Sequence, residues 1–348
     1  DSLPFPAKKK KRLLFLFLPV FLLLSVMFSL LATAFFGING ISSMQSAKTQ
    51  LEKGEFNLAL EDCDKAISSL NYSKVVISTL SPVFKVVGFG AQIESVSEAI
   101  SFSIQMSESM KAVLFSLSKV SVSVGSFLKK ESVDWTEVQK SVKANFSSAY
   151  QQASLAQSSL KEAERGFVLL KKSDYFELIK NSLQDYREKL LKGQKIALAL
   201  PEILSDGSRK TYVVLIQNNL ELRPTGGFVS AFAVVNLENG KLVNFEVYDV
   251  YQTDSQLKGQ IEPPAKIKQL LGEQVWYLRD ANFDPQFSFS ADKILWFLDK
   301  EMHISADGVI SLTLNTFKNI LNIIGGVDLP EYNEKVDKMT KLKITKKN

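Results

Sequence analysis

The sequence contains one cysteine and one histidine among its 348 residues. The single cysteine, Cys63, excludes an intramolecular disulfide, and its neighbours indicate a small apolar position on a helix. The single histidine, His303, excludes catalytic sites of the serine–histidine–aspartate or cysteine–histidine type and metal sites built from several histidines. Any chemistry must therefore come from carboxylates, amides, lysine and arginine.

A strong excess of one charge is also lacking, since the formal net charge is only +5. The basic residues are scattered, apart from the cluster Lys8–Arg12, and no basic strip is interleaved with aromatic residues. That pattern argues against a nucleic-acid partner. The hydrophobic content of 45% is ample for one or two packed domains and a membrane segment.

An apolar run without any charge, Leu13–Phe36, directly follows the basic cluster Lys8–Arg12. As a helix rising about 1.5 Å per residue it would span roughly 36 Å, enough to cross a bilayer. The positive-inside tendency places the cluster in the cytoplasm and the chain after Gly37 outside. The alternative is a cleaved signal peptide, because Ala32–Ala34 resembles a cleavage site. The run is longer than a usual signal sequence, so we expect an uncleaved single-pass anchor in a lipid bilayer.

From Ile41 to about Leu200, apolar residues recur at helical spacing. Gly54 predicts a break between two helices, and Asp134–Glu137 has the form of a capping box that opens another. The apolar stripes are typical of a bundle or coiled stalk. Nothing in this region has the pattern of a catalytic constellation.

At Pro201–Arg209 turn-forming residues indicate a domain boundary, after which strand patterns alternate with short helices. We expect strands at 212–216, 228–236, 241–248 and 309–312, and helices at 265–271, 290–302 and 317–324. This order predicts an α+β or α/β chain with a mixed-sheet head. The expected domains are a cytoplasmic basic segment (1–12), a transmembrane helix (13–36), a helical extracytoplasmic stalk (41–200) and the head (210–348).

A first polar stretch, QNNLELRPTGGF at Gln217–Phe228, follows a strand of buried type. Amides, a carboxylate and Arg223 at the end of a strand favour a ligand site. Gly226 and Gly227 would let a ligand approach the backbone closely. The alternative is a strand–turn–strand corner in which Arg223 caps carbonyl groups.

A second polar stretch runs from Trp276 to Pro285. Asp280, Asn282 and Asp284 have the first, third and fifth spacing of a calcium loop, but the glycine and the last acidic residue of an EF-hand are missing. Two interpretations remain open: a different divalent-metal loop, or an Asx-rich turn with Arg279 paired to a carboxylate.

Three separated motifs resemble those of one bacterial family. ELRPTGGF at 221–228, WYLRDANFDPQF at 276–287, and DGVISL with the later GGVDLP at 307–330 resemble domain-of-unknown-function family 4012, typically made of membrane-anchored surface proteins. The resemblance covers the head strongly and the helical region more loosely. Since that family normally continues past its GGV motif, we expect the chain to be truncated at its C-terminus.

A more distant similarity is to the LytR-CpsA-Psr phosphotransferases, which attach lipid-linked glycopolymers to the bacterial cell wall. It implies a head that holds a pyrophosphate with arginines, binds Mg²⁺ through aspartate and buries a polyprenyl tail. Arg223 falls where that family has an arginine. Asp249 falls near the aspartate of its Pro-Arg-Asp motif, whose arginine is absent here and would be replaced by Arg279.

Together these resemblances imply an envelope protein whose head binds, or as a phosphotransferase transfers, a phosphorylated or lipid-linked glycopolymer, with peptidoglycan as a further candidate partner. The implied phosphate ligands are Asn218, Asn219, Arg223, Gly226, Gly227 and Arg279. The implied Mg²⁺ ligands are Asp249, Asp280 and Asp284. One alternative is a non-enzymatic surface scaffold or binding protein. Another is a eukaryotic glycoprotein, because Asn71–Ser73 and Asn145–Ser147 are acceptor sequons.

Overall fold

The computed structural model describes residues 8–166, 174–204, 207–324, 327–329 and 334–336. Residues 1–7 of the expected cytoplasmic segment, and Gly325 and Gly326 of the GGV motif, lie outside them. The fold is α+β, as predicted. It consists of two compact units. The helical unit is Asp1–Ser118 with Ser141–Ala197, and the sheet unit is Lys119–Lys140 with Leu198–Asn348.

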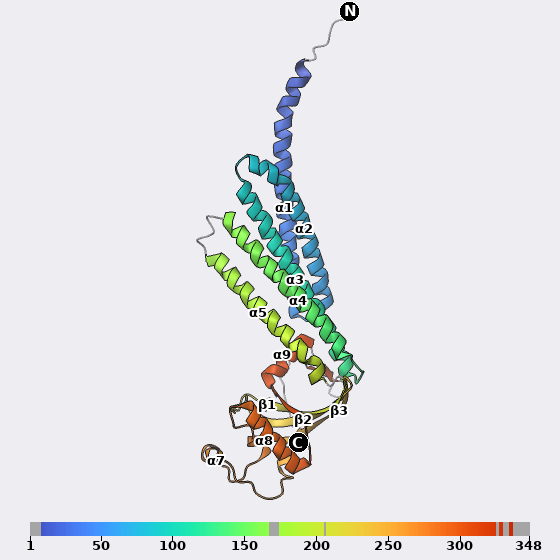
Figure 1. Cartoon of the computed structure of the whole chain (residues 1–348), viewed down its shortest axis with the longest axis vertical. Helices are drawn as coiled ribbons and strands as arrows, with labels where there is room; N and C mark the ends of the chain where they lie inside the picture. Colours follow the sequence, from blue (N-terminus) through green and yellow to red (C-terminus); the bar gives the residue numbers. More distant parts are fainter. Residues whose placement is uncertain (1–7, 167–173, 205–206, 325–326, 330–333, 337–348) are drawn as a thin grey trace, which may run out of the picture. The chain divides into compact units, whose positions relative to one another are not determined.

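Five long helices precede the sheet (Figure 1): α1 (Lys8–Glu52), α2 (Phe56–Val86), α3 (Gly90–Leu128), α4 (Trp135–Gly166) and α5 (Asp174–Ile203). The break expected at Gly54 separates α1 from α2, and this glycine has a φ of +78°. Asp134 precedes α4, and its Oδ1 accepts a hydrogen bond from the Glu137 backbone N–H at 2.8 Å. The capping interaction expected from the sequence is therefore present.

The helical unit is held together by small and aliphatic side chains on both sides of α3. Leu114 of α3 packs with Ala47 of α1 and Cys63 of α2, all fully buried. Other residues of α3 pack with Ala149 of α4 and Leu183 of α5. Burial raises the pKa of the Cys63 thiol to about 11, so this cysteine is a packing residue rather than a nucleophile.

Within the described residues, two helices are long and apolar enough to cross a membrane. One is α1, in which the most apolar 18-residue window of Phe21–Glu52 has a mean hydropathy of 2.3 and only 6% of its residues buried. The other is α3, with a hydropathy of 1.3. Since α3 contributes Ile93, Ile100 and Leu114 to the interior of the bundle, we regard it as a core helix. The N-terminal helix α1 is thus a candidate membrane anchor, and its orientation stays a prediction.

The sheet unit contains four strands in the order β3-β2-β1-β4. They are β1 (Arg209–Asn218), β2 (Phe228–Glu238), β3 (Lys241–Asp249) and β4 (Gly308–Thr313). β1 and β3 run antiparallel to β2, and β4 runs parallel to β1. Asn239 and Gly240 both have positive φ, as expected for the tight hairpin between β2 and β3.

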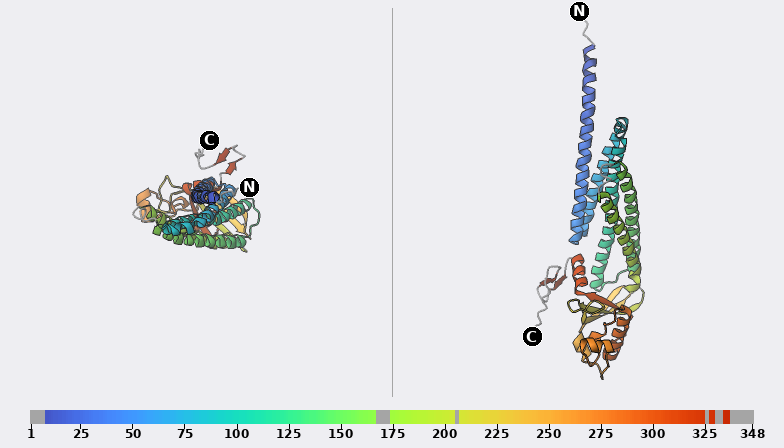
Figure 2. Two further views of the ribbon diagram at one scale, coloured as in Figure 1. Left: turned by 90° about the horizontal axis from the view of Figure 1, so that it is seen from above. Right: turned by 90° about the vertical axis from the view of Figure 1, so that its left-hand side faces the viewer.

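One face of this sheet forms the core of the unit. Leu215 of β1 and Phe232 of β2 are paired in the sheet and pack with Phe297 of α8 (Phe287–Met302). Helix α9 (Leu314–Ile324) lies on the opposite side of the sheet, as both views show (Figures 1 and 2). The strands and helices expected in this region are all present. Elements that the sequence analysis did not predict are α6 (Val250–Asp254), a 3₁₀ turn (Leu278–Asp280), β5 (Val327–Leu329) and β6 (Glu334–Val336).

The segment 119–140, which joins α3 to α4, belongs to the sheet unit. The fully buried Trp135 donates its indole N–H to the Gly240 carbonyl at 3.1 Å. Ser132 donates to the Asn239 carbonyl at 3.1 Å. A side chain at position 240 would collide with the Val133 carbonyl, so glycine is needed there. The sheet unit thus includes a piece of the helical region that no sequence pattern indicated.

Candidate functional site

The two polar stretches meet. The turn after β1 supplies Arg223 and Thr225, and the segment before α8 supplies Asp280 and Asn282. Arg223 pairs with Asp280 at 3.3 Å. The Asn282 amide donates to Thr225 Oγ1 at 3.0 Å and to the Gly227 carbonyl at 2.8 Å. We call these contacts the motif junction. The polar stretch 217–228 therefore packs directly against the polar stretch 276–285.

The glycines of the turn permit close chain packing. Gly226 has a φ of +126° and Gly227 a φ of +153°, both within the region that favours glycine. A side chain at Gly227 would collide with the backbone of Asn218, and one at Gly226 would press on the Gln217 amide. Gln217 is fully buried, donates to Thr225 at 3.1 Å and accepts from Ser311 at 2.6 Å. The backbone of Asn218 and the side chain of Gln217, rather than a ligand, occupy the space that these glycines leave.

Acidic and basic side chains alternate through the motif junction. Arg223 contacts Glu221 at 3.1 Å and one oxygen of Asp280. The other Asp280 oxygen lies 3.6 Å from Arg279 Nε. Arg279 donates to Asp254 of α6 at 2.9 Å. Because the Asp280 carboxylate contacts both guanidinium groups, Arg223 and Arg279 lie close together, and carboxylates rather than an open cleft face them.

Aromatic rings extend the contacts of both arginines. The Arg279 guanidinium lies 4.2 Å from the ring centre of Tyr277 and 5.5 Å from that of Tyr251. Arg223 lies 5.4 Å from the ring centre of Phe228. A cation over a ring face is stabilised by the ring's negative face. Ion pairs and rings together hold both side chains in place.

The carboxylates here have shifted protonation equilibria. Burial raises the pKa of Asp280, and the charges of Arg223 and Arg279 offset this only in part. Burial likewise raises the pKa of Asp254 to about 6, against the lowering effect of Arg279. The pKa of Glu301, near the end of α8, rises to about 8 through burial and the nearby Asp254 charge. Desolvation of the charged form is thus the dominant effect at all three groups.

The remaining predicted site residues have local structural roles. Asp249 caps α6, where Oδ1 accepts from the Tyr251 and Gln252 backbone N–H groups at 2.9 and 3.1 Å. Asp284 accepts from the Gln286 N–H at 2.8 Å. Asn218 accepts from the Leu220 N–H at 3.1 Å, and Asn219 is half-buried in the same turn.

The residues proposed for Mg²⁺ do not form a common site. Asp280 is buried between two arginines, while Asp249 and Asp284 are exposed caps of separate turns. No group of three or more histidine, cysteine or acidic side chains that could hold a metal occurs in the described part of the chain. The Asx-rich turn with a paired Arg279 therefore describes 276–285 better than the metal loop.

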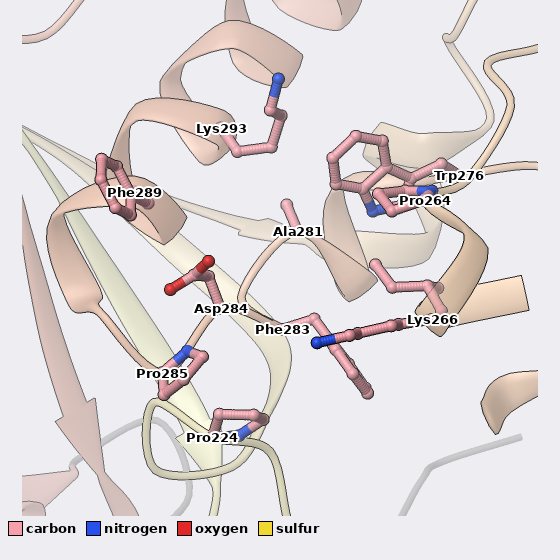
Figure 3. A pocket seen from close by; sticks show the side chains of 11 residues that line it. Pro224, Pro264, Lys266, Trp276, Ala281, Phe283, Asp284, Pro285, Phe289 and Lys293 are labelled. Carbon is pink, nitrogen blue, oxygen red and sulfur yellow. The ribbon is translucent and has the colours of Figure 1, made fainter. Parts of the chain in front are cut away.

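Beside the motif junction lies an open cavity of about 450 Å³ (Figure 3). Both motifs and the two helices α7 (Ala265–Leu271) and α8 line it. Figure 3 shows Phe289 and Lys293 of α8 on one side and Lys266 of α7 on another, with Phe283 between them. The full lining is Pro224, Pro264, Lys266, Ile267, Trp276, Ala281, Phe283, Asp284, Pro285, Phe289 and Lys293.

Every residue of the junction and the cavity lies in the part of the chain that a family model covers. Residues 206–348 match the family model described as a protein of unknown function (DUF4012). The resemblance predicted from the three motifs is therefore confirmed for this region. No curated protein and no solved structure matches the chain.

Within the DUF4012 region, sequence analysis missed four polar residues. Lys266 and Lys293 line the cavity, Asp254 is buried and pairs with Arg279, and Glu301 is buried near Asp254. The spacing of Lys293 on the amphipathic α8 indicates only a helix, and Glu301 lies in its last turn. Trp276 was the one indication of the cavity in the sequence, because a large aromatic residue beside polar residues commonly lines a ligand site.

Proposed function

We propose that the sheet unit binds a phosphorylated or lipid-linked glycopolymer of the cell envelope, and that the cavity beside the motif junction is the binding site. The observation that supports this is the composition of the cavity. Residues of two of the three DUF4012 motifs line it, together with aromatic rings, prolines and two lysines. A volume of about 450 Å³ falls within the range of small-molecule sites, about 300–1,000 Å³.

Each part of the lining suits one part of such a ligand. Trp276, Phe283 and Phe289 offer apolar surface to a prenyl chain or to the apolar face of a sugar ring. Lys266 and Lys293 offer ammonium groups, which bind phosphate as compact positive charges. Asp284 offers an acceptor for a sugar hydroxyl.

The source of positive charge differs from the sequence-based hypothesis. Arg223 and Arg279 are paired with Asp280 and Asp254, so their charge is already balanced inside the protein. In this proposal they position the two motifs, and the lysines bind the anion. The proposal therefore concerns a binding protein, which is the non-enzymatic class among the alternatives.

The probe for this proposal is farnesyl pyrophosphate, which combines an isoprenoid chain with a pyrophosphate. Its binding to the full chain in detergent is measured through tryptophan fluorescence, since Trp276 lines the cavity. We expect saturable binding that farnesol and inorganic pyrophosphate each reproduce only weakly. The double variant Lys266→Ala, Lys293→Ala should weaken binding at least about tenfold, because a charge-assisted contact contributes roughly 1.5–3 kcal/mol.

The matched control is Lys258→Ala, an exposed lysine that does not line the cavity. It should bind the probe as the parent does. Equal binding by the parent and the double lysine variant would contradict the proposed site, and so would an equal loss in the control.

We also propose that α1 anchors the protein with its N-terminus in the cytoplasm and the chain after Gly37 outside. The support is the exposed apolar surface of α1 and the preceding cluster Lys8–Arg12. Protease added to intact cells should remove the sheet unit and spare the cluster. A protected sheet unit would reverse this topology.

A further inference from the structure

The turn between α2 and α3 lies beside the apolar run of α1. Ser73 of α2 donates to the Thr33 carbonyl of α1 at 2.8 Å. Farther along, Val26 of α1 packs against the cluster that contains Leu80 of α2 and Ile93 of α3. Because α1 and α2 run antiparallel, later residues of α2 lie beside earlier residues of α1. The α2–α3 turn therefore reaches at least to the level of Val26, well inside Leu13–Phe36.

This turn has an exposed apolar surface. Val83, Val86, Val87 and Phe89 are 46%, 88%, 60% and 55% exposed, and we call these four residues the apolar tip. Lys85 is the only charged residue between Ser81 and Ile93. Grouped apolar side chains at the end of a hairpin are unfavourable in water, so their exposure indicates an apolar partner.

The neighbouring part of α1 identifies that partner. Phe21, Leu23, Phe28 and Leu31 of α1 are also exposed, by 68%, 68%, 73% and 62%. In Figure 2, right, α1 extends beyond the α2–α3 turn, so its apolar surface continues past the tip. A bilayer that surrounds this part of α1 would also meet the apolar tip.

We propose that the apolar tip inserts into the bilayer that α1 crosses, as a second membrane contact of the helical unit. This proposal rests on α1 being a membrane anchor. Lys85 can extend its ammonium group to the headgroups while its carbons stay in the apolar layer.

Environment-sensitive labels on single introduced cysteines test this. Cys63 is fully buried with a raised pKa, and its replacement by alanine provides a background for labelling. A nitrobenzoxadiazole label is placed on Val87→Cys in the full chain, which is reconstituted in phosphatidylcholine–phosphatidylglycerol vesicles. We expect a blue-shifted emission, quenching by lipids that carry a nitroxide near the headgroup, and protection from aqueous iodide.

Two further positions calibrate the result. Ile196→Cys labels an exposed apolar residue near the C-terminal end of α5. This label should be quenched by iodide alone. Leu23→Cys labels α1 itself and should be quenched by the lipid nitroxide. A lipid-exposed label at Leu23 with a water-exposed label at Val87 would overturn the proposal and leave the anchor intact. Water exposure at both positions would overturn both.

A label at Val87 that is protected from iodide and from the lipid nitroxide alike would show burial against protein, and this also overturns the proposal. A second variant keeps the test independent of the label site. With the reporter at Val83→Cys, adding Val86→Asp and Val87→Asp should restore iodide quenching, because charged side chains disfavour the apolar layer. Since both valines are exposed, these changes leave the interior of the bundle unaltered.

Discussion

The two compact units bury different kinds of polar group. In the described residues of the helical unit, the buried polar side chains all carry hydroxyls: Thr33, Ser73, Ser95, Ser101, Ser107, Ser109, Ser116 and Ser159. In the sheet unit they include three carboxylates and two amides: Asp254, Asp280, Glu301, Gln217 and Asn282.

The difference shows how far each group depends on distant parts of the chain. Ser101, Ser107 and Ser116 donate to the carbonyl four residues earlier in their own helix, so their hydrogen bonds form with the helix itself. A buried carboxylate has no such local solution. Asp280 pairs with its neighbour Arg279 and with Arg223, which lies 57 positions away in the sequence. These three serines can therefore be replaced at little cost, whereas Ser73 and Ser109 of the same unit donate to carbonyls of other helices.

Removing the shared carboxylate is the strongest test of this comparison. Asp280→Ala leaves the guanidinium groups of Arg223 and Arg279 facing each other without the carboxylate between them. We expect the free energy of unfolding to fall by about 3–5 kcal/mol, as when one partner of a buried ion pair is deleted. Chemical denaturation of the full chain, followed by tryptophan fluorescence, measures this. A loss under about 1 kcal/mol would mean that the junction is not structurally required.

The second test concerns Glu301, whose two oxygens are buried without a hydrogen-bond partner. Its pKa is raised to about 8, so the folded state retains a proton that the unfolded chain, with an ordinary pKa of 4.5, releases. The contribution of this proton to the free energy of unfolding is therefore fully present below about pH 4.5. It is lost as the pH rises to about 8. Glu301→Gln cannot lose this proton, and at pH 9 it should exceed the parent in stability by an amount on the order of a few kcal/mol.

Melting temperatures between pH 4 and pH 9 provide the measurement. The slope of the variant should be smaller but not zero, because Asp254, with its pKa of about 6, titrates in the same window. Parallel curves for the two proteins would exclude Glu301 as the source of the pH dependence.

The smallest effect is expected in the helical unit. Ser116→Ala removes a buried hydroxyl that donates to the Ala112 carbonyl of its own helix at 3.3 Å. The carbonyl keeps its helical partner and alanine favours helix, so the free energy of unfolding should change by less than about 1 kcal/mol. Denaturation under the conditions used for Asp280→Ala allows direct comparison. A cost as large as that of Asp280→Ala would remove the contrast between the units.

Sequence patterns were sufficient for the long helices and the four main strands, because these patterns are local. Helical spacing, the break at Gly54 and the cap at Asp134 depend on residues within a few positions of each other. The motifs likewise indicated the DUF4012 region, and they located the polar residues around Arg223 and Arg279. What the motifs could not indicate was whether those arginines face a ligand or a carboxylate, since either requires the same residue types.

The sequence by itself determined that the chain has an apolar N-terminal helix, a helical region and a mixed sheet with two polar motifs. Only the tertiary structure decided that Asp280 lies between the two arginines, that Lys266 and Lys293 share a cavity, and that Val26 lies at the level of the α2–α3 turn. The physical reason is range. Hydrophobic periodicity acts between neighbours in the chain, whereas the desolvation and pairing of charges depend on segments far apart in sequence that folding brings together.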